Sequence, residues 1–403
     1  MSGLAPPPAP ALTAEDLPAD WQRASLVELG GKVTSGSRGW ATFYSDHGDL
    51  FVRITNLRRS DIHLDLSNCR FVKLPLDASE AKRTKLVPGD LLVSITADIG
   101  IIGYVDDTVP SPAYINQHIA RVRFDPRRVS SKFVAYYLSS WEPQRAFVGM
   151  TDTGAKAGMN LTMVGALETV VPPLPEQRRI AEALDDVDEQ LRKHELLLAK
   201  KRAIKVGVMQ RLLAGKSRLP GFTRHWQVRR LADLLSYEQP GRFLVRTTKQ
   251  LPSGRVPVLT AGKTFLLGYT NETHGVYRDH PVVIFDDFTT ASQYVDFDFK
   301  AKSSAMKILS ARPGADLRFV FERMQLIQFP VQDHKRYWIS EYSQQTIEVP
   351  DLDEQQAIAA VAHDCDYEIR MLRARLAKAR AMREGMMQAL LSGRKRLRAE
   401  EEA

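Results

Sequence analysis

Residues 174–219 read LPEQRRIAEALDDVDEQLRKHELLLAKKRAIKVGVMQRLLAGKSRL, and residues 352–397 read LDEQQAIAAVAHDCDYEIRMLRARLAKARAMREGMMQALLSGRKRL. The two stretches align without a gap at a shift of 178 positions, with 21 identities in 46 positions. Self-similarity of this kind marks a structural unit that is used more than once in a chain. The sequence therefore predicts two copies of one helical unit.

Each copy has the start and stop signals of a long helix. The starts are Pro175-Glu176 and Asp353-Glu354, with acidic residues in the first turn, and the stops are Gly215 and Gly393, which suit a left-handed cap. A helix over 176–214 would be about 58 Å long at 1.5 Å per residue.

Apolar residues recur in each copy at alternating steps of four and three, which is the heptad spacing of a coiled coil. In the first copy these residues are Ile180, Leu184, Val187, Leu191 and Leu198. In the second copy they are Ile358, Ala362, Cys365, Ile369, Leu372 and Leu376. Two matching seams in one chain most simply pair with each other, which predicts an antiparallel coiled coil.

Polar residues interrupt the first seam at His194 and Lys201, which leaves the pairing of that stretch open. We expect His194 to be packed or to snorkel between helices rather than to bind a metal. Gly207 and Gly385 fall at equivalent places inside the two helices, where each costs about 1 kcal/mol relative to alanine. Because a glycine is present at the same place in both copies, we expect a close helix crossing or a bend there. We expect charged residues off the seam, namely Arg178, Arg202 and Lys205, to remain free for partners or phosphates.

A second pair of anchors lies upstream of the helical copies. Trp21-Gln22 is followed by two leucines at the same spacing as those that follow Trp226-Gln227. From Trp21 to Glu176 is 155 residues and from Trp226 to Glu354 is 128, so the second intervening block is 27 residues shorter. The blocks share little sequence between their ends. Both contain strand-like runs, such as 90–96 and 282–285, and we expect two diverged α/β domains.

The composition restricts the class of protein. Lys and Arg outnumber Asp and Glu by 56 to 48, giving a net charge of +8, which suits a polyanionic partner but does not require one. Cys69 and Cys365 are the two cysteines, so a disulfide scaffold is excluded. The sequence lacks an apolar run of about 18 residues, and we expect a cytoplasmic protein with a flexible leader over 1–16.

Parts of the sequence resemble enzyme motifs, each of which requires a particular spacing of residues. Gly262-Lys263-Thr264 resembles the end of a phosphate-binding loop, but Pro257 stands where that loop needs glycine. Asp286 or Asp287 with 298–300 has the composition of a metal-dependent nuclease site, and the alternative is a charged turn. The proline-proline-aromatic signature of an amino-methyltransferase is absent, because Leu174 follows Pro172-Pro173. We expect no catalytic residue and no metal ligand.

The two helical copies carry a resemblance to a known family. Residues 172–191 and 200–222 strongly resemble the central conserved region of the specificity subunit of type I restriction–modification enzymes, and residues 352–397 look like its distal conserved region. Three shorter pieces, 89–92, 116–118 and 258–263, resemble its target-recognition domains. The resemblance extends from about Trp21 to Leu397.

The resemblance implies a fold with a pseudo-twofold internal repeat. Two α/β (α+β) target-recognition domains are separated by two long helices that form an antiparallel coiled coil. The implied regions are a leader over 1–16, recognition domain 1 over 17–173, the central helical region over 174–217, recognition domain 2 over 218–350, the distal helical region over 351–398 and a tail over 399–403.

The resemblance also implies a function in host defence and DNA methylation. Each recognition domain would read one half of a bipartite, asymmetric site on double-stranded DNA, and the coiled coil would set the spacer and dock two methyltransferase subunits. Motor–nuclease subunits would join through that complex. S-adenosylmethionine, ATP and Mg²⁺ would belong to those partners and not to this chain. A self-contained DNA-modifying or DNA-cleaving enzyme and a structural coiled-coil adaptor remain the alternatives.

Basic and polar residues in loops are the candidate DNA contacts. The strongest precede the helical copies, where glycine-containing or aromatic loops suit groove or phosphate contact. The full candidate set is Arg53, Arg58, Arg59, Arg121, Lys156, Asn160, Lys263, Thr289, Lys335 and Arg336.

Overall fold

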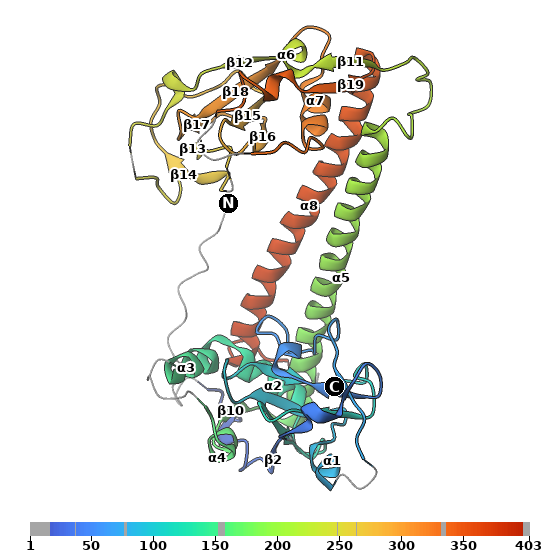
Figure 1. The fold of residues 1–403 in the computed structure, drawn as a ribbon. Coiled ribbons are helices and arrows are strands. Elements are labelled where there is room, and N and C mark those ends of the chain that lie inside the picture. The colour runs from blue at the N-terminus through green and yellow to red at the C-terminus, as the bar shows by residue number, and fades with distance from the viewer. Residues whose placement is uncertain are drawn as a thin grey trace. The chain divides into compact units, whose positions relative to one another are not determined.

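The computed structural model describes residues 17–36, 38–75, 79–151, 158–247, 249–262, 264–331 and 336–397. The proposed leader and tail lie outside the described residues. The chain divides into two compact units, which we call unit 1 (Met1–Glu195 with Ala374–Ala403) and unit 2 (Leu196–Arg373). Each unit contains one α/β domain and one half of each long helix (Figure 1).

The α/β domain of unit 1 is built on two four-stranded sheets and a two-stranded ribbon. The sheet orders are β2-β9-β6-β7 and β3-β5-β4-β8, and the ribbon pairs β1 with β10. The strands are β1 Gln22–Ser25, β2 Lys32–Ser35, β3 Tyr44–Ser45, β4 Asp49–Val52, β5 Phe71–Val72, β6 Leu91–Ser94, β7 Ile102–Tyr104, β8 Ala113–Ile115, β9 Ile119–Arg123 and β10 Glu168–Val171. The helices are η2 Trp40–Phe43, η3 Ile54–Asn56, α1 Ser79–Thr84, α2 Ser131–Ser139, α3 Trp141–Thr151 and α4 Leu161–Gly165.

The α/β domain of unit 2 repeats the main sheet and the ribbon. Its sheet orders are β12-β18-β15-β16 and β14-β13-β17, and its ribbon pairs β11 with β19. The strands are β11 Gln227–Arg230, β12 Leu235–Glu238, β13 Val256–Leu259, β14 Leu266–Thr270, β15 Val282–Asp286, β16 Ser292–Val295, β17 Lys300–Ala301, β18 Met306–Ala311 and β19 Thr346–Val349. The helices are α6 Leu231–Leu234, η4 Gly241–Phe243, α7 Leu317–Met324 and η5 Tyr342–Gln344.

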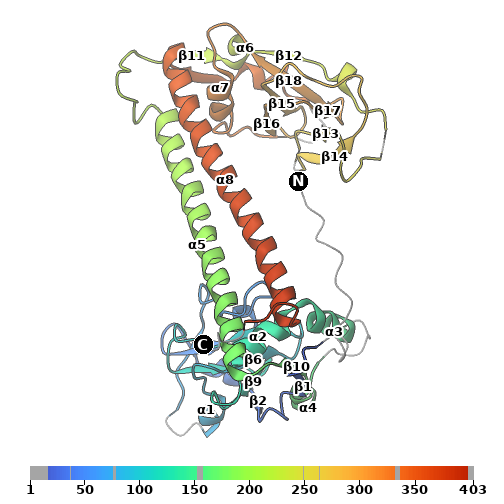
Figure 2. The ribbon, with the colours of Figure 1, turned by 180° about the vertical axis from the view of Figure 1, so that it is seen from behind.

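Two 40-residue helices, α5 (Leu174–Leu213) and α8 (Leu352–Leu391), continue from these domains. Within each unit they lie side by side and antiparallel, as both views show (Figures 1 and 2). The predicted fold class, two α/β domains with a pair of long helices, is confirmed. Gly215 and Gly393 follow the helix ends with φ of 64° and 73°, so the predicted left-handed caps are also confirmed.

The ends of the long helices complete the hydrophobic cores of the α/β domains. In unit 1, Ile180 and Leu184 of α5 and Leu390 of α8 belong to the domain core. In unit 2, Leu212 of α5 and Ile358 of α8 do the same. Because each core needs both helices, a domain and its helix ends are expected to fold together.

The middle parts of the helices bury the remaining seam residues. Leu191, Leu198, Ile369, Leu372 and Leu376 are buried, whereas Val187 and Cys365 are half-buried. The expected close helix crossing at Gly207 and Gly385 is wrong, because a Cβ atom added at either glycine would meet nothing within 4 Å. None of the helices in the described part of the chain is long and apolar enough to cross a membrane.

Candidate nucleic-acid interface

A buried carboxylate holds the start of α5 in unit 1. Glu176 is 3% exposed and accepts hydrogen bonds from Trp21 Nε1 at 3.4 Å and from the Arg396 guanidinium at 2.6 and 2.8 Å. Burial opposes the ionisation of Glu176, but the hydrogen bonds from Arg396 and from the Leu397 N–H outweigh it and lower the pKa of Glu176. The start of α5 is thereby attached to the residue that precedes β1 and to the segment after α8.

We call a buried glutamate that accepts hydrogen bonds from a tryptophan and an arginine a clamp. Unit 2 contains a second clamp of the same kind. Glu354 is 1% exposed and accepts hydrogen bonds from Trp226 Nε1 at 3.2 Å and from Arg218 at 2.5 and 2.6 Å. In both units the arginine also lies over the tryptophan ring, at 5.4 Å in unit 1 and 5.7 Å in unit 2. The glutamates and the arginines are each 178 positions apart, so the repeat extends to individual hydrogen bonds.

A buried glutamine next to each clamp connects the long helix to the N-terminus of a domain helix. Gln177 Oε1 accepts a hydrogen bond from the Ser130 N–H at 2.9 Å, and Gln355 Oε1 accepts one from the Asp316 N–H at 2.8 Å. Ser130 caps α2 and Asp316 caps α7. The two α/β domains are therefore attached to the long helices in the same way.

The β6–β7 hairpin of unit 1 meets the segment that precedes α4. The Met159 N–H donates to the Ile95 carbonyl at 2.8 Å, and Thr96 forms a β-bridge with Gly158. Thr96 Oγ1 also lies 2.5 Å from His118 Nδ1. We call residues 95–99, His118 and 158–160 together tip 1.

The β15–β16 hairpin of unit 2 meets the corresponding segment. The Tyr337 N–H donates to the Asp287 carbonyl at 3.0 Å, and Tyr337 is 178 positions after Met159. The exposed Arg336 guanidinium lies over the Phe288 ring at 5.7 Å. We call residues 287–291 and 336–338 tip 2.

A buried ion pair joins Asp287 of tip 2 to Lys307 of β18. Asp287 is 2% exposed and Lys307 is 1% exposed, and their charged atoms are 3.0 Å apart. Asp287 Oδ1 also accepts hydrogen bonds from the backbone N–H groups of Tyr337 and Trp338 at 3.1 and 2.8 Å. Asp287 therefore fixes the position of Arg336 relative to the hairpin.

The two hairpins share an unusual backbone feature. Ala97 in tip 1 has a φ of 62° and Thr290 in tip 2 has a φ of 57°, which is the left-handed region that few residues other than glycine adopt. Strained residues of this kind concentrate at binding sites. The tips thus share a backbone arrangement but present different side chains, with threonine, histidine and asparagine in one and phenylalanine, threonine and arginine in the other. Such groups can bond base edges or stack on bases.

Three of the predicted DNA-binding residues lie on the tips. Thr289 and Arg336 are exposed on tip 2, where Arg336 lies against Phe288 of the hairpin that carries Thr289. Asn160 is exposed on tip 1, and its Oδ1 caps α4 by accepting from the Met163 N–H at 2.8 Å, which leaves its amide nitrogen as the side-chain donor. Lys156, Lys263 and Lys335 lie outside the described residues.

The other predicted arginines are engaged within unit 1. Arg58 forms an ion pair with Asp65, and Arg59 forms one with Asp98 of tip 1. Arg53 donates to the Asn68 carbonyl at 3.2 Å. Arg121 is only 8% exposed and donates to the Lys85 carbonyl at 2.9 Å, and its burial lowers the pKa of the guanidinium. Because its charged group is enclosed in the domain, the structure does not support direct DNA contact by Arg121.

Ion pairs link the two long helices. In unit 1, Arg383 pairs with Asp188. In unit 2, Lys205 pairs with Asp366 at 2.6 Å, at positions that are equivalent in the repeat. The expectation that Lys205 is free for partners is therefore wrong, because the helix register places a carboxylate opposite it.

The polar stretch of the α5 seam has partners of its own. Lys201 Nζ lies 2.7 Å from Glu368 Oε2, so an ion pair replaces an apolar contact at this level. His194 is half-buried, and its Nδ1 lies 2.8 Å from the Gln190 carbonyl of its own helix. Arg178 donates to the Pro126 carbonyl at 2.9 Å, and Arg202 is exposed.

The structure separates the residues of the nuclease hypothesis. Asp287 pairs with Lys307, whereas Lys300 is fully buried and its Nζ lies 3.1 Å from a Glu272 carboxylate oxygen. Asp298 lies 3.2 Å from His280. In the part of the chain that the structure describes, no three His, Cys, Asp or Glu side chains are grouped so that they could hold a metal ion.

Sequence reasoning missed the clamps and the glutamine contacts. Their signal was present, because Glu176, Gln177 and Arg218 are polar residues that are identical in both copies. A polar identity between diverged repeats indicates a shared hydrogen bond. Thr96 and His118 of tip 1 had no comparable signal, since their meeting depends on how distant strands pair.

Comparisons with known proteins agree with this architecture. Residues 53–200 match the family described as the type I restriction modification DNA specificity domain. The EcoR124I/EcoR124II specificity subunit of Escherichia coli is 48% identical over 137 residues. That segment covers 32% of this chain and 34% of the relative, so the match spans about a third of the relative's length.

Two solved structures share the fold. The S subunit of a type I restriction-modification system from M. genitalium superposes with a TM-score of 0.68 at 13% identity, covering 93% of this chain and 98% of that one. A chain from a structure on assembly and conformational transition of the type I R-M system gives a TM-score of 0.52 at 14% identity, with the same coverage. Residues 53–200 therefore match the type I restriction modification DNA specificity domain, and the chain shares the fold of the M. genitalium S subunit.

Proposed function

We propose that this chain is the DNA-reading, non-catalytic subunit of a type I restriction–modification complex, and that each α/β domain reads one half of a bipartite, asymmetric DNA site. The observation that carries the proposal is the pair of tips. They have equivalent backbone contacts, such as Met159 to Ile95 and Tyr337 to Asp287, but different side chains. Two different DNA half-sites require such an arrangement, because backbone contacts position a protein and side chains read bases.

The proposal assigns two further roles to the paired helices. They set the length of the spacer between the half-sites, and they dock two methyltransferase subunits. The clamps support the second role, since a structure repeated in one chain presents the same surface twice and so suits two copies of one partner. Motor–nuclease subunits join through this complex. S-adenosylmethionine, ATP and Mg²⁺ bind to the partner subunits.

The alternatives explain less of the structure. A self-contained nuclease would need carboxylates that are available to a metal, whereas ion pairs engage Asp287, Lys300 and Asp298, three residues of the nuclease hypothesis. A structural adaptor would account for α5 and α8, but it would give no reason for two diverged domains attached by identical contacts.

Mapping methylated adenines tests the proposal. The genome of a cell that carries this chain with its partner subunits is sequenced for methylated positions, with a strain lacking only this chain as the control. We expect one sequence made of two different half-sites separated by a gap of fixed length, and loss of that methylation in the control. Methylation that persists without the chain, or methylation by the purified chain with S-adenosylmethionine alone, would contradict the proposal.

A further inference from the structure

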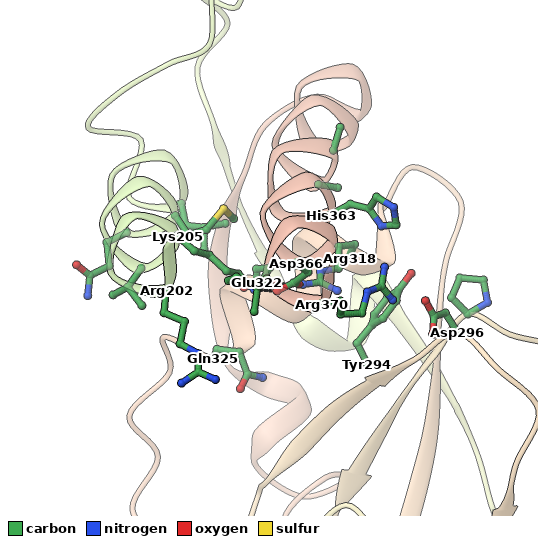
Figure 3. A pocket seen from close by; sticks show the side chains of 18 of the residues that line it. Arg202, Lys205, Tyr294, Asp296, Arg318, Glu322, Gln325, His363, Asp366 and Arg370 are labelled. Carbon is green, nitrogen blue, oxygen red and sulfur yellow. Dashed lines mark hydrogen bonds and ion pairs between the residues drawn. The ribbon is translucent and has the colours of Figure 1, made fainter. Parts of the chain in front are cut away.

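Unit 2 contains an open groove of about 1200 Å³ between its long helices and its α/β domain. Figure 3 shows Arg202 and Lys205 from α5, Arg318 and Glu322 from α7, and Arg370 from α8 around it. All of the lining residues belong to unit 2. The groove is separate from tip 2, because the residues of tip 2 are not among those that line it.

The equivalent groove of unit 1 is about half as large, at about 570 Å³. One of its walls is the chain's own segment 58–66, which includes Asp61 and His63. Asp61 lies 3.1 Å from Arg192 of α5, and His63 Nε2 lies 3.1 Å from Asp185 of α5. In unit 1, therefore, a polypeptide segment that carries a carboxylate lies against this face of the long helices.

The repeat makes the charges of the two grooves directly comparable. Arg192 corresponds to Arg370 in unit 2, and the Arg380–Glu195 ion pair of unit 1 corresponds to Arg202 and Arg373. The Arg380–Glu195 pair has an N–O distance of 2.6 Å, whereas its unit 2 counterpart consists of two cations.

Unit 2 thus has three arginines where unit 1 has two ion pairs. The side chains of Arg202, Arg370 and Arg373 are exposed, line the groove and make no hydrogen bond or ion pair with any residue that the structure describes. Carboxylates are the complementary groups, since arginine binds them in bidentate geometry.

Apolar side chains also line the groove. Val206 is 55% exposed and Leu326 is 45% exposed, and the buried Ile369 also lines the groove. A phosphate backbone gains nothing from apolar contacts, whereas a polypeptide can cover them. The lining therefore favours a polypeptide over a nucleic acid.

We propose that the unit 2 groove is a docking site for an acidic, partly apolar polypeptide segment of a partner protein, which binds once per chain. The segment occupies the position that 58–66 takes in unit 1, and its carboxylates pair with Arg202, Arg370 and Arg373. This inference goes beyond the proposed function, because that function gives both copies of the repeat the same role, whereas the docking segment binds to unit 2 alone.

The variant Arg373→Glu tests the charge requirement without disturbing the fold. It places a carboxylate opposite Arg202, as Glu195 stands opposite Arg380, so the helices gain an ion pair while the groove loses the cation of Arg373 and the free charge of Arg202. Arg375→Glu is the matched control, because Arg375 is exposed on α8 and does not line the groove. Thermal unfolding of both variants should match the parent chain within a few degrees.

The readout is a photo-crosslinking residue placed at His363, an exposed position in the groove. The complex is purified with its natural partners and irradiated, and the crosslinked peptide is sequenced by mass spectrometry. We expect one segment of another polypeptide, rich in Asp and Glu, with a yield that falls at least tenfold in Arg373→Glu and is unchanged in Arg375→Glu.

Several results would overturn the inference. They are a crosslink to DNA, a crosslink to this chain, no crosslink in the assembled complex, or a yield that Arg373→Glu leaves unchanged. Methylation mapping of the same preparations separates the two proposals, because a complex that still methylates its bipartite site without a groove crosslink retains the proposed function and loses only this inference.

Discussion

Arg396 and Glu176 are 220 positions apart in the chain, yet two parallel hydrogen bonds of 2.6 and 2.8 Å join their side chains. Glu176 is 3% exposed, so its charge depends on this partner. We expect Glu176→Gln to lower the free energy of unfolding of unit 1 by about 3 kcal/mol, because removal of one member of a buried pair leaves the other uncompensated. Urea unfolding of the full chain measures the change.

The repeat provides matched controls for that measurement. Glu354→Gln should have a comparable effect on unit 2, and Glu182→Gln, at an exposed position of α5, should change the unfolding midpoint little. Equal midpoints for Glu176→Gln and Glu182→Gln would show that the clamp does not stabilise unit 1.

His63 should make the stability of unit 1 depend on pH. Burial opposes its protonation, but hydrogen bonds to Asp185 and Asp61 outweigh burial and raise the pKa of His63 to about 9. In the unfolded chain the pKa is about 6.5. The folded state therefore binds the additional proton, and its stabilising effect is complete below pH 6.5 and is lost as the pH rises through about 9.

The measurement is the free energy of unfolding in urea between pH 6 and pH 9.5. We expect the parent chain to lose on the order of 1–3 kcal/mol over this range. His63→Gln should show a smaller loss, because glutamine does not titrate. Parallel pH profiles for the two proteins would be inconsistent with a charged His63 in the folded state.

The tips should carry the base contacts. Arg336→Ala or Thr289→Ala should weaken DNA binding of the assembled complex by about 1–3 kcal/mol and relax selectivity in one half-site only. Binding is measured at two salt concentrations on the natural site and on sites altered in either half. The control is Arg229→Ala, because Arg229 is an exposed arginine on β11.

If Lys156 of unit 1 also contacts DNA, the double variant Lys156→Ala with Arg336→Ala should weaken DNA binding further than Arg336→Ala alone. Unchanged DNA binding would remove both residues from the interface.

The two domains should read DNA independently. Replacing residues 226–350 with the corresponding block of a relative should change one half-site and leave the other, as seen by methylation mapping. The main sheet and the ribbon of unit 2 fall within this block, so the exchange keeps them intact. A change in both half-sites would mean that the domains do not act separately.

The paired helices should set the spacer. One heptad inserted after Leu198 and one after Leu376 keeps the seam in register and adds about 10 Å. The spacer should then lengthen by about three base pairs, at about 3.4 Å each, with both half-sites unchanged. An unchanged spacer would assign the distance to the docked partner subunits.

The sequence predicted the parts of the fold that depend on local pattern. The helix of residues 174–213 and the glycine cap at Gly215 follow from heptad spacing and backbone preference. Buried strands such as β6 and β15 were also recognisable, because their apolar runs are continuous. Two-residue strands such as β3 are too short to leave a pattern.

The candidate site was less predictable because its residues meet through long-range pairing. Arg121 resembles a surface cation in the sequence, but its strand places the side chain inside the domain. Lys205 resembles a free charge until the register of α5 against α8 brings Asp366 opposite it. The contact of Thr96 with His118 depends on the sheet order, which no local signal specifies.

The clamps also bear on how this polypeptide arose. In unit 2 the chain runs directly from Arg218 of the clamp to Trp226, whereas in unit 1 the equivalent Arg396 and Trp21 are 375 positions apart in the chain. The Arg396 guanidinium also donates a hydrogen bond to Asp20 Oδ2 at 2.7 Å. In unit 1, therefore, side chains rather than a continuous stretch of chain join the two segments. Tandem duplication and fusion of an ancestral gene for one domain and one helix would produce this arrangement, in which one junction became a linker and the other remained a contact between side chains.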